Sequence, residues 1–341
     1  MSDTTTLLNS LVEKKNITAQ DAAAFLDDVM EGNVSPVQAG AILTALRMKG
    51  ETADEILGFV QAMRARMLTV KAEGAIDIVG TGGDEVGPFN ISTASAFAAA
   101  GAGAKVAKHG NRSASSKCGS ADVLEALGVN IHLTPDEAQK VIERTGIVFL
   151  FAPLFHPATK QVVAVRKELK IRTIFNVLGP LLNPAGVKRQ LLGAANAAVG
   201  KKIADVAALL GYDHLLVVSS EDGMDKISLS AKTKAFDITG RKVKAFTIDP
   251  KKFGFKAGTK KDILGGTADE NAQIIRDILA GKKGPKRDIV VLNTAFALYV
   301  AGIAKTPYDG IALAEKSIDS GEARKALERL VEETNAFPKP V

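Results

Sequence analysis

The sequence is poor in the residues that build disulfide frameworks and aromatic binding surfaces. Its 341 residues include a single cysteine, Cys118, with three Tyr and no Trp. One cysteine excludes an internal disulfide framework, and scarce aromatic rings leave little surface for stacking on nucleic-acid bases. Small residues are abundant instead, with 31 Gly in the chain and an Ala-rich run at 97–105. This composition favours closely packed helices and strands.

The chain also lacks a long hydrophobic run. Residues 1–16 contain no basic segment followed by an apolar core, so no secretory signal is visible. The longest apolar stretch, 289–304, is shorter than the roughly 20 residues of a membrane span and carries Asn293 and Thr294 in its middle. We interpret it as a buried strand followed by a helix. The sequence therefore predicts a cytoplasmic protein that does not enter a membrane.

Acidic residues are scarce in one region of the chain. The net charge is +6, and the isoelectric point is about 9.2. Between Lys232 and Lys261, ten Lys or Arg residues stand against two acids, Asp237 and Asp249. This excess indicates a solvated hairpin or loop surface, which is the favoured interpretation, or a patch that attracts nucleic acid or phosphate. Nucleic acid is the less favoured partner.

Helix signals dominate the first 70 residues. Thr18 precedes apolar residues at helical spacing, and Ser35-Pro36 can cap and open a second helix. Gly50 ends that helix, and Thr52 opens a third that runs to about Met67. No strand signal occurs there, so residues 1–71 are predicted to form a small all-helical domain.

Strands alternate with helices from residue 76 onward. The sequence predicts short strands at 76–79, 105–108, 129–132, 147–150, 215–218 and 289–292, and helices from about residue 92, at 120–127 and at 135–145. This alternation predicts an α/β domain over 72–341, with a mostly parallel central sheet flanked by helices. A segment at about 170–190 is expected to return to the helical domain.

A glycine-rich motif, GTGGD at 80–84, directly follows the first predicted strand. Glycines let backbone N–H groups approach an anion closely, and the start of the next helix adds its positive end. The segment 90–93 then places three polar side chains at that helix start, where capping would explain only one. Such a turn alone is a weak signal, but the two segments together predict a phosphate cradle.

A second polar segment, KHGNRSASS at 108–116, follows the second predicted strand. It combines two fixed positive charges, an imidazole, an amide and three hydroxyls within nine residues. In open α/β sheets, ligands bind at the carboxyl ends of the strands. Ser120 and Asp122 begin the next helix, and capping suffices to explain either of them alone.

Taken in order, these motifs resemble those of the anthranilate phosphoribosyltransferase family. GTGGD with FNIST is followed by KHGNR with SSKCGSADVLEALGV, FAPLFHPATK with VRKEL, RTIFNVLGPLLNPA, and NTAFALYVAG at 293–302. The first two motifs are partly shared with pyrimidine nucleoside phosphorylases, whereas GPLLNPA and the paired HGNR and HPATK segments are more specific. The resemblance covers nearly the whole chain. It implies a small helical domain on a large α/β domain, and a homodimer formed through the helical domain.

The resemblance also implies ligands and their residues. The ligands are 5-phosphoribosyl 1-pyrophosphate, anthranilate and Mg²⁺, the last held by Ser92 and Asp225. The resemblance implies that Asn111 and Arg166 contact anthranilate, because the Arg166 guanidinium can form a bidentate ion pair with its carboxylate. It also implies that His109, Gly179 and Pro180 line the path of anthranilate. The donor-binding residues are Gly80, Gly83, Asp84, Asn90, Ile91, Ser92, Thr93, Lys108, His109, Gly110, Asn111, Arg112, Ser113, Ala114, Ser115, Ser116 and Ser120.

The chain departs from the family pattern at a few positions. Lys226 occupies the place of a glutamate that ligates magnesium beside Asp225, and Ser219 stands where a histidine is common. Pro88 replaces a Thr or Ser that usually helps to hold the donor, and Thr159 replaces a frequent methionine. The lysine predicts a weakened metal site. His156 either lines the acceptor pocket or packs in the core, and His132 and His214 are interpreted as structural.

The implied reaction is attack of the anthranilate amine on the anomeric carbon of the donor, with pyrophosphate leaving. A neutral aromatic amine is already nucleophilic, so alignment and charge stabilisation are the main tasks and no catalytic residue is assigned. Two alternatives stay open: a pyrimidine nucleoside phosphorylase, and a divergent family member without activity that binds nucleic acid through the basic surface.

Overall fold

The amino-terminal helices begin and end at the capping residues that the sequence predicts. The computed structural model describes residues 3–82, 87–113 and 117–338. Thr18 caps the second helix by accepting a hydrogen bond from the Asp21 N–H, and Ser35 and Thr52 form capping boxes. The helices of this unit are α1 (Thr4–Val12), α2 (Ala19–Glu31), α3 (Pro36–Lys49) and α4 (Ala53–Arg66).

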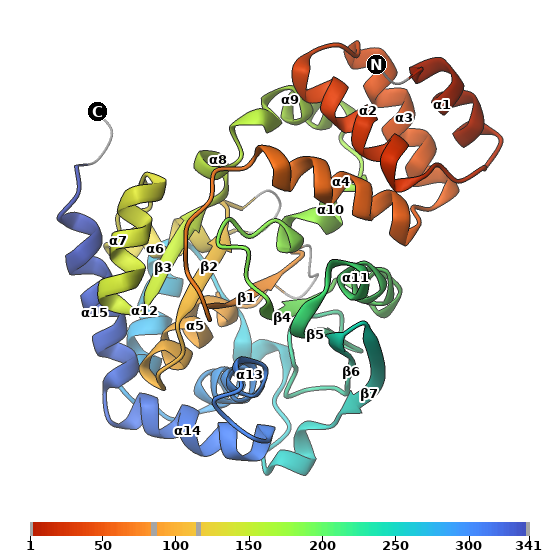
Figure 1. Cartoon of the computed structure of the whole chain (residues 1–341). Helices are drawn as coiled ribbons and strands as arrows, with labels where there is room; N and C mark the ends of the chain where they lie inside the picture. The colour runs from red at the N-terminus through yellow and green to blue at the C-terminus, as the bar shows by residue number, and fades with distance from the viewer. Residues whose placement is uncertain (1–2, 83–86, 114–116, 339–341) are drawn as a thin grey trace.

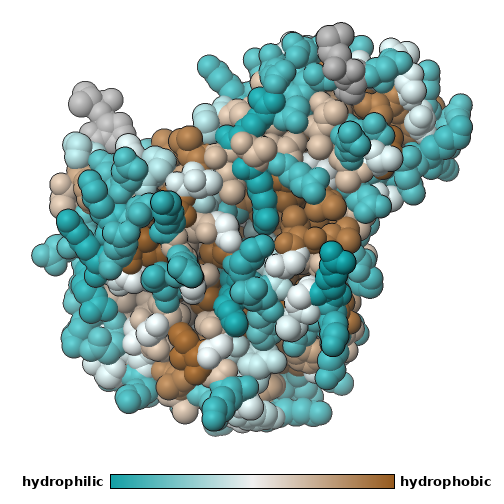
Figure 2. Space-filling view, in the orientation of Figure 1, coloured by the Kyte–Doolittle hydropathy of each residue, from teal (hydrophilic) through white to brown (hydrophobic). Residues whose placement is uncertain are grey.

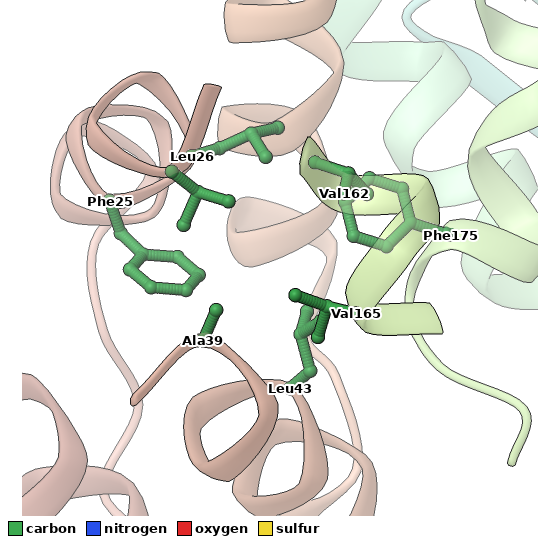
Figure 3. Close-up of a pocket in the computed structure, with 8 residues that line it drawn as sticks. Phe25, Leu26, Ala39, Leu43, Val162, Val165 and Phe175 are labelled. Atoms are coloured by element: carbon green, nitrogen blue, oxygen red, sulfur yellow. The ribbon is translucent and has the colours of Figure 1, made fainter. Parts of the chain in front are cut away.

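A crossover segment after the third strand packs against these helices. It consists of α8 (Ala152–Phe155), α9 (Lys160–Leu169) and α10 (Phe175–Leu178), with 3₁₀ turns at Pro157–Thr159 and Gly179–Leu181. Figure 3 shows α9 and α10 turning apolar side chains toward α2 and α3, with Val162 and Val165 facing Phe25 and Leu43. The helix α9 precedes the segment expected to return at 170–190, so the contact with the helical unit begins earlier in the chain.

The rest of the chain is built on a seven-stranded sheet in the order β3-β2-β1-β4-β5-β6-β7 (Figure 1). The first five strands in this order run parallel, and β6 and β7 add an antiparallel hairpin at one edge. The mostly parallel sheet predicted from the sequence is confirmed. The strands are β1 (Ile76–Gly80), β2 (Val106–Gly110), β3 (Ile147–Phe151), β4 (Arg189–Gly193), β5 (Tyr212–Ser220), β6 (Thr233–Gly240) and β7 (Lys242–Ile248).

Each face of the sheet contributes to a different hydrophobic core. In β5, Leu216 and Val218 belong to one core, and Leu215 and Val217 belong to the other. The first core is completed by α5 (Ile91–Gly101), α6 (Ser120–Ala126), α7 (Pro135–Thr145), α12 (Ala268–Leu279), α13 (Pro285–Ala301), α14 (Pro307–Asp319) and α15 (Glu322–Asn335). The second continues from α11 (Ala197–Leu210) into the amino-terminal helices. The helical unit is therefore an extension of one sheet face.

The direction of the chain reverses between the two central strands. The connection from β1 runs through α5 to β2 on one side, and the connection from β4 runs through α11 to β5 on the other. The strands β1 and β4 are parallel neighbours, and α5 and α11 cover opposite faces. Open α/β sheets bind ligands in the crevice that such a switch point leaves at the carboxyl ends of the strands. The expected site therefore lies beyond Gly80 and Gly193.

Several elements differ from the sequence-based predictions. Residues 289–292 are not a strand but lie within α13, a helix that is buried on almost every side, so no polar face marks its period. Residues 129–132 form no strand, and β4 was not predicted. The basic stretch forms β6, β7 and the turns after them, which confirms the solvated-hairpin interpretation: most of β7 is exposed.

On the face of the molecule that Figure 2 shows, apolar side chains gather where the helical unit meets the sheet-containing part, among mostly polar surroundings. Within the described residues, no helix is long and apolar enough to cross a membrane. The domain boundary at residues 71–72 stays a prediction.

Two helical glycines provide a test of the packing of the helical unit. A Cβ on Gly58 of α4 would collide with the Ala19 carbonyl and Ala22 of α2, whereas one on Gly40 of α3 would make ordinary contact with Leu169. We expect Gly58→Ala to lower the free energy of unfolding by about 1–3 kcal/mol, the usual cost of overpacking. Gly40→Ala should leave it unchanged or raise it by up to about 1 kcal/mol, because alanine favours helix.

Urea unfolding followed by circular dichroism measures both variants. Equal effects of the two substitutions would contradict the close approach of α2 and α4.

Candidate active site

The loop that follows β5 packs against the carboxyl ends of β1 and β4. Asp225 of this loop is only 2% exposed, and its Oδ2 accepts a hydrogen bond of 3.0 Å from the Gly82 N–H in the glycine-rich turn. A Cβ on Gly80 would collide with the Asp225 carboxylate, and one on Gly193 with the Asp225 backbone. Two strands therefore end in glycine at the point where the carboxylate enters.

Two lysines lie close to this carboxylate. Lys226 forms an ion pair with Asp225 Oδ1, and its side chain is 13% exposed. Lys108 of β2 is buried and donates a hydrogen bond of 2.7 Å to the Ile78 carbonyl. Burial lowers the pKa of Lys108 to about 8; the carboxylate of Asp77 opposes this shift, and the charge of Lys226 adds to it. The site thus combines cationic and anionic groups with little access to water.

The start of α5 and the loop after β2 are joined by amide side chains. Asn90 donates to the Cys118 carbonyl at 3.2 Å and accepts from Asn271 at 2.9 Å. Ile91 and Thr93 are buried, whereas Ser92 is half-buried in the first turn of α5, and its hydroxyl has no hydrogen-bond partner among the described residues. Ser92 is therefore the side chain of this helix start that is available to a ligand.

Asp122 of α6 organises the loop after β2. Its Oδ2 accepts hydrogen bonds from the backbone N–H groups of Gly119 at 2.8 Å and Ser113 at 3.1 Å. Its Oδ1 pairs at 3.1 Å with Arg112, which also pairs with Glu125. The Arg112 guanidinium is thus held by α6 in this structure. Ser120 donates to the Asn111 carbonyl at 3.3 Å, and a Cβ on Gly110 would collide with the Ser120 hydroxyl.

Two buried histidines meet beside the crossover segment. The Nε2 atoms of His109 and His156 are 3.3 Å apart, and the Gly179 backbone lies against His109. Burial lowers the pKa of His109 to about 3, with a further contribution from His156, and burial lowers the pKa of His156 to about 4. Both rings are therefore neutral at pH 7. His156 Nδ1 is buried without a hydrogen-bond partner among the described residues.

A buried carboxylate in the middle of β1 fixes the same segment. Asp77 Oδ2 accepts hydrogen bonds from Asn183 at 2.9 Å and Gln190 at 3.4 Å, and Oδ1 accepts from the His109 N–H at 3.3 Å. Gln190 also donates to the Pro180 carbonyl at 2.8 Å. Burial raises the pKa of Asp77 to about 6, opposed by Lys108 and by these hydrogen bonds. This network ties β1, β2 and β4 to the crossover.

Comparisons with known proteins identify the family of the chain. Residues 5–67 match the helical bundle domain of a glycosyl transferase family, and residues 72–324 match its a/b domain. The anthranilate phosphoribosyltransferase of Acetivibrio thermocellus is 49% identical to this chain, and the match covers 97% of this chain and 96% of the relative. That of Methanobrevibacter smithii is also 49% identical, and the match covers 96% of this chain and 98% of the relative. The chain belongs to the anthranilate phosphoribosyltransferase family.

Solved structures of this family share the fold. The anthranilate phosphoribosyltransferase of Thermus thermophilus superposes with a TM-score of 0.90 at 39% identity, covering 96% of this chain and 99% of its own. The enzyme of Saccharomyces cerevisiae, in complex with PRPP and Mg, also superposes with a TM-score of 0.90, at 28% identity and 98% coverage of both chains. The same yeast enzyme was solved with 4-fluoroanthranilate, and its TM-score is 0.86.

The structure brings many of the residues implied by the family resemblance to one edge of the sheet. Gly80, the α5 start, the end of β2 and Asp225 are linked by the contacts described above. Arg166 lies apart on α9, with its guanidinium 5.4 Å from the centre of the Phe175 ring, and contacts none of these residues. Gly83, Asp84, Ala114, Ser115 and Ser116 lie outside the described residues. No group of three or more His, Cys, Asp or Glu in the described part of the chain is placed to hold a metal.

Sequence reasoning missed several residues of the site. Asp77 is an acid inside an otherwise apolar strand, and this pattern is a signal of a buried partner that could have found it. Asn271 and Gln190 have no local signal, because their partners Asn90 and Asp77 are distant in the sequence. His214 contacts Asp237 at 2.9 Å, away from the contacts described for the site, in agreement with a structural role. His132 lies 3.8 Å from Glu125, the carboxylate that also pairs with Arg112.

The neutral histidine pair predicts a dependence of stability on pH. A histidine whose pKa is lower in the folded than in the unfolded protein takes up a proton on unfolding, so stability falls as the pH drops below 6.5, the ordinary value. Asparagine at 156 takes up no proton. Between pH 6.5 and 5.0, we expect the free energy of unfolding to fall by about 1.5 kcal/mol more in the wild type than in His156→Asn.

Urea unfolding of both proteins at the two pH values measures this difference. The raised pKa of Asp77 has the opposite effect, because it increases the free energy of unfolding as the pH falls over this range. Asp77 is present in both proteins, so its contribution cancels in the comparison. Parallel pH dependences would show that burial does not hold His156 neutral.

Proposed function

We propose that this protein transfers the phosphoribosyl group of 5-phosphoribosyl 1-pyrophosphate to the amine of anthranilate, giving N-(5-phosphoribosyl)anthranilate and pyrophosphate. The observation that carries the proposal is the β1–β4 switch point, where the glycine turn that precedes α5 meets the buried Asp225 carboxylate. Relatives of 47–49% identity over at least 95% of the chain bear the name of this activity. We place the donor in this crevice.

The donor's phosphates would be bound at the start of α5 and at the loop beside it. The first turn of α5 adds the positive potential of a helix start. In the glycine turn, the described N–H groups of Thr81 and Gly82 are already bonded to the Gly193 carbonyl and the Asp225 carboxylate. Ser92 has a hydroxyl to donate, and the segment from Gly110 to Ser113 is fixed by Asp122 and Ser120 beside it.

The residues present fit one Mg²⁺ ion brought in with the donor. Magnesium prefers oxygen ligands and is commonly bound by one or two carboxylates together with waters and substrate phosphates. Asp225 offers a buried carboxylate, and Ser92 a hydroxyl, at the same edge of the sheet. The second oxygen of Asp225 is already paired with Lys226. When bound, the ion would offset negative charge on the leaving pyrophosphate.

The acceptor would approach from the crossover side. Arg166 carries a guanidinium that matches a carboxylate in shape and charge, and Asn111, His109, Gly179 and Pro180 line the path to the crevice. In the reaction the nitrogen–carbon bond forms as the carbon–oxygen bond to pyrophosphate breaks, and the amine releases a proton. The neutral state of His109 and His156 leaves no fixed positive charge beside the incoming amine.

The activity is tested by following the loss of anthranilate fluorescence. Purified protein with 5-phosphoribosyl 1-pyrophosphate and Mg²⁺ should consume anthranilate, and omission of the donor should stop the reaction. A second arm supplies thymidine and phosphate, the substrates of a pyrimidine nucleoside phosphorylase. Base release in that arm without anthranilate consumption would replace the proposal with the phosphorylase alternative.

The acceptor assignment predicts the effect of changing Arg166. Arg166→Ala should raise the KM for anthranilate by about 10- to 150-fold, because losing a charged hydrogen-bond pair costs about 1.5–3 kcal/mol. The KM for the donor should change little. Lys167→Ala, at an exposed neighbouring position on α9, is the matched control and should retain the wild-type KM. An unchanged KM in Arg166→Ala would remove this residue from the acceptor site.

We also propose a homodimer formed through the helical unit. Val37 and Met48 of α3 are 82% and 81% exposed and lie on one helix face, with Ala41 and Thr44 between them. Such an apolar stripe on a helix whose other face is buried favours pairing with a second copy. Met48→Glu should therefore shift the mass measured by light scattering from dimer to monomer.

Leu209→Glu, at an exposed apolar position on α11, provides the control for this substitution and should leave the mass unchanged. A wild-type protein that is monomeric at micromolar concentration would refute the dimer.

A further inference from the structure

The loop that carries Asp225 places a cation, the ammonium of Lys226, against the buried carboxylate. This ammonium pairs with Asp225 Oδ1, while Asp225 Oδ2 accepts the N–H of Gly82. Both oxygens of the carboxylate are therefore engaged by positive or N–H groups of the protein. A metal ion that binds Asp225 must displace the ammonium or share the carboxylate with it.

The other carboxylates of the loop do not compensate for this. Asp222 accepts a hydrogen bond of 2.6 Å from the Ser228 hydroxyl through Oδ2, and one of 3.3 Å from the Met224 N–H through Oδ1. These contacts direct Asp222 into its own loop. Glu221 is exposed. Within the described residues, the loop thus offers the crevice one carboxylate, and that carboxylate is paired with Lys226.

The charge balance at this place does not demand a second divalent cation. Lys108 and Lys226 face two buried carboxylates, Asp77 and Asp225, so these four groups are neutral in sum. A glutamate at position 226 would make the sum two units more negative and would attract metal. With lysine, the ammonium has three donors on a flexible stem and can turn from Asp225 to an incoming phosphate.

We propose that Lys226 binds the pyrophosphate group of the donor directly and takes the place of one metal ion. The inference rests on the proposed function, because it assumes that the crevice is the donor site. It deepens that function in one respect: part of the affinity for the pyrophosphate group is independent of Mg²⁺. Asp225, once released by Lys226, becomes available to the single ion that accompanies the donor.

Isothermal titration calorimetry with inorganic pyrophosphate tests the inference without turnover. In EDTA, the wild type should bind pyrophosphate, and Lys226→Met should bind it about 10- to 100-fold more weakly, the range for losing a charge-assisted hydrogen bond. Lys226→Arg keeps the charge and should retain most of the affinity. Lys232→Met removes one positive charge from a nearby exposed position and should bind as the wild type does.

The number of bound metal ions gives an independent readout. Electron paramagnetic resonance of Mn²⁺ with pyrophosphate should count one ion per chain in the wild type and two in Lys226→Glu. Equal pyrophosphate affinity of wild type and Lys226→Met in EDTA would overturn the proposal, as would two ions in the wild type.

The two proposals fail separately. If Lys226→Met weakens pyrophosphate binding but the wild type consumes no anthranilate, the contact between Lys226 and pyrophosphate stands and the proposed function fails. If anthranilate is consumed while the affinities in EDTA are equal, the function stands and the inference fails.

Discussion

The structure depends on one close approach: the backbone and carboxylate of Asp225 lie against the carboxyl ends of β1 and β4. Only glycine at positions 80 and 193 leaves room for this loop. The hydrogen bond from Gly82 to Asp225 then joins the glycine turn to the loop after β5. Three connections that are far apart in the sequence are thereby held at one point of the sheet. The carboxyl ends of β1 and β4 are thus shaped by contacts within the protein.

The helical unit is coupled to this point through the crossover. Arg64 of α4 donates to the Leu181 carbonyl at 2.9 and 2.7 Å and to the Tyr212 hydroxyl at 3.1 Å. Asp77, by way of Gln190 and Asn183, holds the same crossover from the side of the sheet. The segment that contains Gly179 and Pro180 is thus held by hydrogen bonds from both parts of the molecule. The proposed acceptor path therefore runs along a segment that both parts of the molecule hold in place.

The sequence predicted the elements whose signals are local. Caps such as Thr18 and Ser35 depend on neighbouring residues and were placed correctly. The strand predicted at 289–292 was wrong because α13 is buried on almost every side, so no polar face marks its helical period. The pairing of Asn90 with Asn271, and of Asp77 with Asn183, joins residues more than a hundred positions apart. Such contacts follow from the packing of the whole chain and leave no local pattern.

The most direct test is a crystal structure of the protein with inorganic pyrophosphate and Mg²⁺. We expect pyrophosphate at the carboxyl ends of β1 and β4, between the glycine turn and the first turn of α5, with the Lys226 ammonium on a phosphate oxygen. Pyrophosphate bound elsewhere, for example on the basic β6–β7 hairpin with the crevice empty, would contradict this expectation.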